Sequence, residues 1–90
     1  MLMNFTKVVH FTRLIKAGGR LREFNFRKLR GQEQELFTVD TVDDRGNRIL
    51  FRMEKNGNSN WSIIQQILPA WIPENEEKFH ECIEDELQKG

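Results

Sequence analysis

Three polar residues in the C-terminal part of the chain have the spacing of a metal site. Glu76, His80 and Glu84 lie four positions apart, so a helix would place all three on one face. Glu77 adds the Glu-x-x-His spacing of carboxylate-bridged metal sites, which need matching ligands from other helices of a bundle. The only other histidine in the sequence is His10. We therefore interpret the stripe as a solvated helix face and predict no metal and no cofactor.

The remaining polar residues form no recognisable catalytic motif. Gly18-Gly19 lacks the preceding strand and the following helix that a glycine-rich phosphate loop needs. The acidic pairs Asp43-Asp44 and Asp85-Glu86 suit a turn and a helix surface. Cys82, the single cysteine, lies among apolar residues, as expected for a small core side chain. The sequence therefore predicts a protein that is not an enzyme.

A basic segment between residues 20 and 30 offers a different chemistry, the binding of nucleic acid. Its cations alternate with Phe24 and Phe26, so they could neutralise phosphates while the rings stack on bases. A protein this small also needs those rings in its core, and burial would leave the cations only a role at the phosphate backbone. The candidate nucleic-acid-binding residues are Arg20, Arg22, Arg27, Lys28 and Arg30.

Length and charge limit the class of protein. The chain has 90 residues, which predicts a single domain over residues 1–90. Its net charge is zero, but residues 1–30 carry eight Lys and Arg against one acid, and residues 31–90 carry the opposite excess. This division favours two ends that face each other or coat opposite surfaces, and it can also mark a nucleic-acid surface or a self-complementary interface. Neither a membrane span nor a signal peptide is visible, so we predict a cytoplasmic protein.

The elements that would position these residues begin with an ambiguous segment. A helical wheel places Val8, Phe11, Leu14 and Ile15 on one side of residues 4–16, and the two glycines that follow would end such a helix. The β-branched residues of the same segment also favour a strand. We predict a helix over residues 4–16, with a strand as the alternative.

Alternating apolar and polar residues predict four strands after this segment, at about residues 21–30, 35–43, 47–55 and 60–67. A loop of Asp44-Arg45-Gly46 would pair Val39 with Phe51 and Phe37 with Met53, so that the large apolar side chains share one face. In such a loop the glycine adopts the left-handed conformation of a G1 bulge.

The next turn predicts the pairing of the last strand. With Asn56-Gly57-Asn58 as the loop, Trp61 would lie opposite Met53 and Ile63 opposite Phe51, which buries the larger aromatic side chain.

A C-terminal helix follows at about residues 73–88. Pro73 and the acids after it are typical of a helix start. Ile72, Phe79, Ile83 and Leu87 repeat at helical spacing and should pack on the sheet face that carries the phenylalanines. The predicted fold class is α+β, a four-stranded antiparallel meander with this helix on one face.

One helix covers only one face of such a sheet. The other face mixes apolar and polar residues and needs the N-terminal segment or a second subunit to cover it. We predict a non-enzymatic binding module of unknown ligand that forms a homodimer through this face. The candidate interface residues are Leu36, Thr38, Val42, Leu50, Arg52 and Ile64.

The runs FNFRKLR, FTVDTVDDRGNRILFRMEKNG and LPAWI resemble those of short hypothetical bacterial proteins, to which no function is attached. The order of four strands and a helix is similar, in architecture alone, to single-strand-binding domains of the PC4, Whirly and PUR type. This similarity implies an alternative function, a single-stranded nucleic-acid-binding domain that uses residues 20–30.

Overall fold

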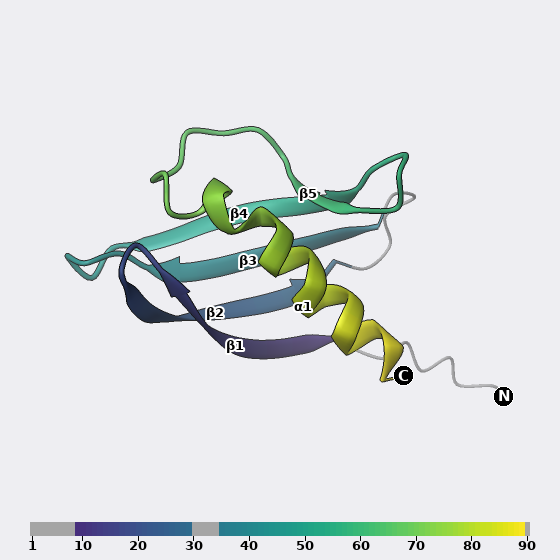
Figure 1. The fold of residues 1–90 in the computed structure, drawn as a ribbon, viewed down its shortest axis with the longest axis horizontal. Coiled ribbons are helices and arrows are strands. Elements are labelled where there is room, and N and C mark those ends of the chain that lie inside the picture. The colour runs from purple at the N-terminus through teal and green to yellow at the C-terminus, as the bar shows by residue number, and fades with distance from the viewer. Residues whose placement is uncertain (1–8, 30–34, 90) are drawn as a thin grey trace, which may run out of the picture.

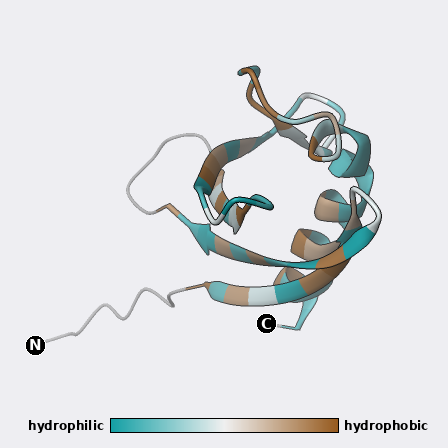
Figure 2. Cartoon of the chain, turned by 90° about the vertical axis from the view of Figure 1, so that its left-hand side faces the viewer, coloured by the Kyte–Doolittle hydropathy of each residue, from teal (hydrophilic) through white to brown (hydrophobic). Residues whose placement is uncertain are grey.

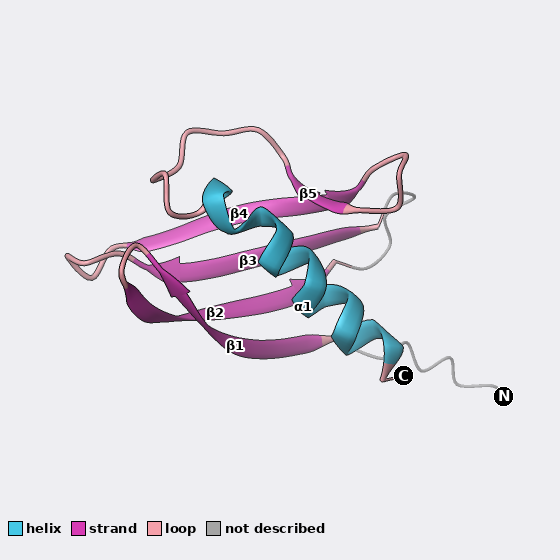
Figure 3. Ribbon diagram, in the orientation of Figure 1, coloured by secondary structure: helices cyan, strands magenta, loops and turns pink. Residues whose placement is uncertain are grey.

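The computed structural model describes residues 9–29 and 35–89, which form one five-stranded antiparallel sheet and one long helix (Figures 1 and 3). Strands that are neighbours in the sequence are neighbours in the sheet, so the sheet is a meander. The predicted α+β class is confirmed, with one strand more than predicted. The elements are β1 (His10–Ala17), β2 (Arg20–Lys28), β3 (Leu36–Val42), β4 (Arg48–Lys55), β5 (Trp61–Ile63), the 3₁₀ helix η1 (Pro73–Asn75) and α1 (Glu76–Gln88).

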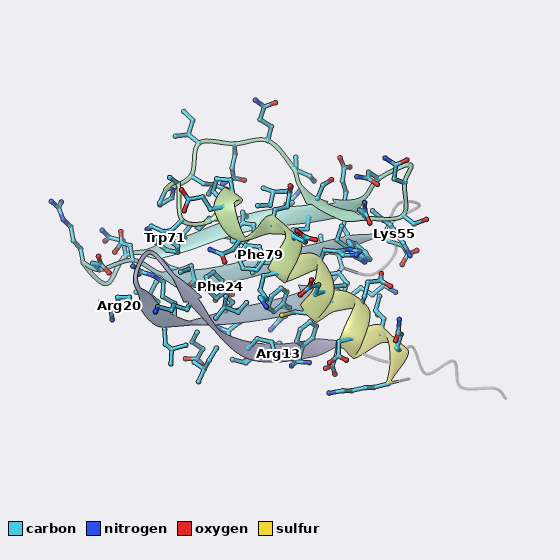
Figure 4. The ribbon with its side chains drawn as sticks, in the orientation of Figure 1. Arg13, Arg20, Phe24, Lys55, Trp71 and Phe79 are labelled. Atoms are coloured by element: carbon cyan, nitrogen blue, oxygen red, sulfur yellow. The ribbon has the colours of Figure 1, made fainter. Side chains whose placement is uncertain are left out.

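The sheet curls around α1, which crosses its inner face (Figures 1 and 2). Phe79 attaches the helix: its ring centroid lies 5.0 Å from that of Phe24 and 5.6 Å from that of Phe51, and all three side chains are buried (Figure 4). The prediction of a helix over about residues 73–88 on the phenylalanine face is confirmed. The buried core comprises Phe11, Ile15, Ala17, Phe24, Phe26, Phe37, Val39, Phe51, Met53, Trp61, Ile72, Phe79 and Ile83.

The predicted helix over residues 4–16 is wrong in its described part, because residues 10–17 form β1. Residues 4–8 lie outside the described residues. In β1 the side chain of Phe11 faces the core and stacks on Phe26 of β2, with 4.6 Å between ring centroids. The local pattern allowed helix or strand, and pairing with β2 decided between them because it buries this ring pair.

The two glycines after β1 make a hairpin turn and do not end a helix. Gly18 and Gly19 have φ values of 62° and 83°, and the strands close with Ala17 opposite Arg20. Positive φ at both central residues is what a type I′ hairpin turn requires. A Cβ on Gly18 would also lie 3.0 Å from the ring of Trp71. Glycine is therefore required at position 18 for two reasons: the backbone has a positive φ, and a side chain would collide with Trp71.

The predicted register between β3 and β4 is confirmed. Val39 lies opposite Phe51 and Phe37 opposite Met53, and Gly46 has a φ of 86°. The Asp43 carboxylate organises the turn by accepting hydrogen bonds from the backbone N–H groups two and four residues ahead, at 2.9 and 2.8 Å. This Asx interaction replaces backbone partners that the loop lacks.

These hydrogen bonds should make the β3–β4 turn sensitive to acid. The backbone N–H of Asn47, and to a smaller degree that of Arg45, lowers the pKa of the Asp43 carboxyl below 3.8. Because the folded-state pKa is the lower one, the carboxylate stabilises the turn above the unfolded-state pKa, and this contribution is lost as the pH falls through the folded-state pKa. We expect an NMR titration to give a pKa below 3.8 for the Asp43 carboxyl. A value at or above this number would contradict the hydrogen bonds.

The predicted register between β4 and β5 is wrong by two residues. Ile63, and not Trp61, lies opposite Met53, while Trp61 lies opposite Lys55. A shift of two residues keeps the same side chains on the buried face. Trp61 is therefore buried as predicted, although its cross-strand partner differs.

The reason for the shift lies in the side chain of Asn56. Its Oδ1 accepts hydrogen bonds from the backbone N–H groups of Asn58 and Asn60, at 2.9 and 3.0 Å, in the way that Asp43 organises the preceding hairpin. The loop is therefore Gly57-Asn58-Ser59, and Ser59 takes the left-handed position with a φ of 64°. The prediction placed Gly57 at the centre of the loop, but the hydrogen bonds of the Asn56 side chain determine which residues form it.

We expect the substitution Ser59→Gly to stabilise the protein by about 0.5–1 kcal/mol, because a side chain at positive φ costs roughly 1–2 kcal/mol that glycine avoids. The midpoint of thermal unfolding should rise by about 2–8 °C. Gly57→Ala is the control: this glycine is not at positive φ and no atom lies within 4 Å of an added Cβ. Destabilisation by Ser59→Gly would show that the loop is placed wrongly.

Candidate interaction surface

The face of the sheet that points away from α1, here called the outer face, exposes large apolar side chains. Leu14, Leu21, Val42 and Leu50 are 67%, 63%, 50% and 48% exposed. No element in residues 9–29 and 35–89 forms a second layer over this face, since α1 lies on the inner one (Figure 2). These four side chains are here called the outer stripe.

The outer stripe crosses four strands. The registers place Leu14 diagonal to Leu21 on β1 and β2, and Val42 diagonal to Leu50 on β3 and β4. Diagonal neighbours on a sheet face lie roughly 7–8 Å apart, within reach of long side chains. The stripe is therefore a shared surface of β1 to β4 and does not belong to any single strand.

A hollow lies in the middle of the outer stripe. The pairing of β2 with β3 ends at Asn25 and Asp40. Beyond this point a hollow of about 230 Å³ opens, with Leu21 and Val42 among its lining residues. It is large enough to receive a side chain from another protein.

The six predicted interface residues lie on or beside the strands of the outer face. Val42, Leu50 and Arg52 are exposed, and Leu36, Thr38 and Ile64 are half-buried. Thr38 and Arg52 are direct cross-strand partners, and the Ile64 amide donates to the Arg52 carbonyl at 2.9 Å. The sequence interpretation missed Leu14 because it assigned a helix there. The alternation of residues 21–27 could have identified Leu21.

A row of hydrogen-bonded polar side chains runs beside the outer stripe. Thr12 Oγ1 donates to Asn25 Oδ1 at 2.6 Å, and Asn25 Nδ2 donates to Asp40 Oδ1 at 3.0 Å. Arg48 completes the row by donating to Asp40 Oδ2 at 3.1 Å. These groups satisfy one another within the fold, whereas the side chains of the outer stripe remain exposed.

The structure does not bring the four described candidate nucleic-acid-binding residues onto one surface. Arg20 and Lys28 are paired with carboxylates, and Arg22 is buried. Arg27 is exposed on the outer face, and Arg30 lies outside the described residues. The basic segment therefore does not form a continuous cationic surface within the described residues.

Arg22 has a structural role that engages two nitrogens and the plane of its guanidinium group. Its Nε donates to the Ala17 carbonyl at 2.8 Å, and its Nη1 lies 3.1 Å from Asp44 Oδ1. The guanidinium also lies over the ring of Trp71, 3.9 Å from the centroid. Figure 4 shows Trp71 near the start of α1. Arg22 thereby ties together both long hairpins and the segment before the helix.

Base stacking on Phe24 and Phe26 is excluded, because both side chains are fully buried between the sheet and α1. The face that carries them is the face that the helix covers. Within the described residues, the basic segment retains only the possibility of contacts to a phosphate backbone.

The Glu76, His80 and Glu84 stripe binds the edge of β5. Glu76 accepts from the Ile63 N–H at 2.7 Å, His80 Nδ1 from the Trp61 N–H at 3.0 Å, and Glu84 from the Trp61 indole N–H at 2.9 Å. The stripe is therefore not a solvated face, since it satisfies donors that an edge strand leaves open. The described residues contain no group of three or more His, Cys, Asp or Glu that could hold a metal ion.

Cys82 is half-buried beside the core. Burial raises the pKa of its thiol, an effect that the nearby Arg13 guanidinium opposes. A thiol with a raised pKa is a poor nucleophile at neutral pH. The position fits the predicted core residue.

The uneven charges of the two ends partly compensate within one molecule. Arg13 of β1 binds Glu86 of α1 at 2.9 Å and lies 3.6 Å from Asp85 (Figure 4). Arg20 lies 3.1 Å from Asp44. Contact between the two ends, one of the explanations for the charge division, is therefore realised inside the fold.

Comparison of the chain with known protein families, with curated proteins and with solved structures finds no match. The similarity to the single-strand-binding domains accordingly stays a prediction. In the described residues, no helix is long and apolar enough to cross a membrane.

Proposed function

We propose that the protein is a non-enzymatic interaction module that associates with a second copy of itself through the outer face of its sheet. The observation that carries this proposal is the outer stripe, four large apolar side chains that are 48–67% exposed on a face without a second layer in the described residues. Exposed apolar groups of this kind mark interaction surfaces.

The energetics favour a weak dimer. Full burial of a leucine or valine side chain contributes roughly 1.5–3 kcal/mol, so covering the exposed half of each contributes about 1 kcal/mol. A twofold contact uses the stripe of both subunits and gains about 8 kcal/mol, against an association cost of roughly 4–15 kcal/mol. At the low end of that cost the surplus is about 4 kcal/mol, which corresponds to a Kd of about 1 mM, so we expect dimers to appear only from high micromolar concentration upward.

Light scattering over a range of concentrations tests this proposal. The wild-type mass should rise above that of the monomer at high micromolar concentration, and Leu50→Lys should lower the fraction of the protein that associates. Ile67→Lys is the matched control, because Ile67 is fully exposed but lies in the segment between β5 and η1, outside the stripe. A monomeric mass at all concentrations would remove the proposal.

A second candidate function is contact with the phosphate backbone of single-stranded nucleic acid. It is favoured by Arg27 and Arg52, which flank Thr38 in one row of the outer face. Both are exposed, and neither has a carboxylate partner within residues 9–29 and 35–89. Each cation that binds a phosphate makes the affinity fall with salt concentration.

Retention of labelled single-stranded DNA and RNA at low salt tests this second function. We expect weak binding that disappears as salt is raised, with a smaller salt dependence in Arg27→Gln and Arg52→Gln. Arg45→Gln, in the exposed turn after β3, is the control. An absence of retention at low salt would eliminate this candidate.

A further inference from the structure

β1 is an open edge of the sheet. It is eight residues long, and every one of its residues is paired with β2. The other edge, β5, has three residues and is covered by α1 side chains through Glu76 and His80. The strand order places no described strand on the far side of β1. The fold therefore protects one edge and leaves the longer one open.

The backbone groups at this open edge belong to the even-numbered residues. Val9 accepts a hydrogen bond from the Lys28 N–H at 3.0 Å, and the closing pair of the hairpin joins Ala17 to Arg20. In an antiparallel ladder the groups of successive residues point to opposite sides, so the odd residues of β1 bond to β2. The groups that point away from β2 are those of His10, Thr12, Leu14 and Lys16.

Within the described residues these edge groups have almost no other partner. The Thr12 carbonyl accepts a bond of 3.2 Å from the Arg13 guanidinium, and a carbonyl can accept a second bond. The sequence of the strand, HFTRLIKA, contains no proline, and its ladder with β2 has no bulge. It thus lacks two of the devices that block pairing of an edge, although Lys16 is one of the charged side chains that discourage it.

From this geometry we infer that β1 pairs antiparallel with β1 of a second copy and joins two sheets into one. The pairing uses the backbone, and it is a contact separate from the face-to-face contact of the outer stripe. It rests on the proposed self-association only in that both need a second copy of the chain.

The side chains select the register of this pairing. If the twofold axis of the pairing passed through Arg13, this cation would lie opposite Arg13 of the second copy, which is unfavourable because like charges repel. If the axis passes through Leu14, the Leu14 side chains of the two copies lie opposite each other, and each is 67% exposed in the single chain. Thr12 then pairs with Lys16 of the second copy. In this register the even residues exchange about six N–H···O bonds.

Hydrogen exchange at low and high protein concentration tests the inference. We expect the Thr12, Leu14 and Lys16 amides to exchange freely in the monomer and to become at least tenfold protected in the associated protein. Face-to-face association alone would leave these amides unprotected. Protection is therefore the signature of edge pairing, and its absence in an associated protein would overturn this inference while the proposed function stands.

A matched pair of variants isolates the backbone contribution. Thr12→Pro removes an edge N–H that β2 does not use, and proline is tolerated on edge strands in this orientation. Thr12→Val also loses the hydroxyl bond to Asn25 but keeps the N–H. We expect Thr12→Pro to abolish the concentration-dependent protection of Leu14 and Thr12→Val to retain it.

The remaining outcomes separate the two proposals. Leu50→Lys should leave the protection of the Leu14 amide unchanged if the edge contact is independent of the outer stripe. Persistent protection in Thr12→Pro would overturn the edge pairing. A wild-type chain that is monomeric at every concentration would overturn the edge pairing and the proposed function together. The protection of core amides in Phe11 and Ile15 confirms that each variant is folded.

Discussion

Replacing Phe79 with alanine is expected to destabilise the protein by about 3–5 kcal/mol, the largest effect that we predict. The ring lies in the centre of the core, within 5.0–6.2 Å of the rings of Phe24, Phe51 and Phe26. Phe79 and Ile83 are the only buried residues of α1. Loss of the ring would create a cavity and leave Ile83 as the one buried side chain of α1. Native proteins have a total stability of roughly 5–15 kcal/mol, so this loss would be a large fraction of it.

Urea denaturation followed by circular dichroism measures this effect. Phe79→Leu is the control, since it keeps an apolar side chain of similar volume and should cost only about 1–1.5 kcal/mol. A change below about 1 kcal/mol in Phe79→Ala would mean that α1 does not close the inner face of the sheet.

Replacing Arg22 with methionine is expected to destabilise the protein by about 2–3 kcal/mol. Methionine keeps an apolar stem beside Trp71 but removes the donors to the Ala17 carbonyl and to Asp44. The Ala17 carbonyl would then lose its guanidinium partner in a buried position. Lysine should restore only part of the stability, because an ammonium group does not reproduce the planar stacking or the directed hydrogen bonds of a guanidinium.

Arg20→Met is the matched control for this prediction. Arg20 binds the same Asp44 oxygen at 3.1 Å, but its side chain is 63% exposed, and exposed ion pairs contribute about 0–1 kcal/mol. The two variants thus compare a buried and an exposed arginine with one shared partner. Equal stabilities in urea denaturation would contradict the structural role of Arg22.

The turns show how far local sequence can predict structure here. The β3–β4 register was predictable because a three-residue loop places Val39, Phe51, Phe37 and Met53 on one face, whereas a two-residue loop does not. At the β4–β5 turn two loops keep the same face buried, so burial could not choose between them. The side chain of Asn56 made that choice through hydrogen bonds that a hydrophobic pattern does not contain.

The candidate surface was predictable only in part, for a related reason. Period-two alternation placed Val42 and Leu50 on the outer face. Leu14 was missed because a helical wheel and a strand both group Phe11 with Ile15, and no local signal reveals β2 as the partner. Arg22 was predicted to bind nucleic acid because no local pattern reveals its burial. That burial depends on Trp71, which is distant in the sequence.

The sequence by itself determined the α+β class, the C-terminal helix, the inner face of the sheet and the β3–β4 register, because periodicity and turn chemistry are local. Tertiary structure alone decided that residues 10–17 are a strand, that the Glu76, His80 and Glu84 stripe caps β5, and that Arg22 is buried. These features depend on which distant segments meet. A burial pattern records that a side chain needs a partner, but it does not record which partner the fold provides.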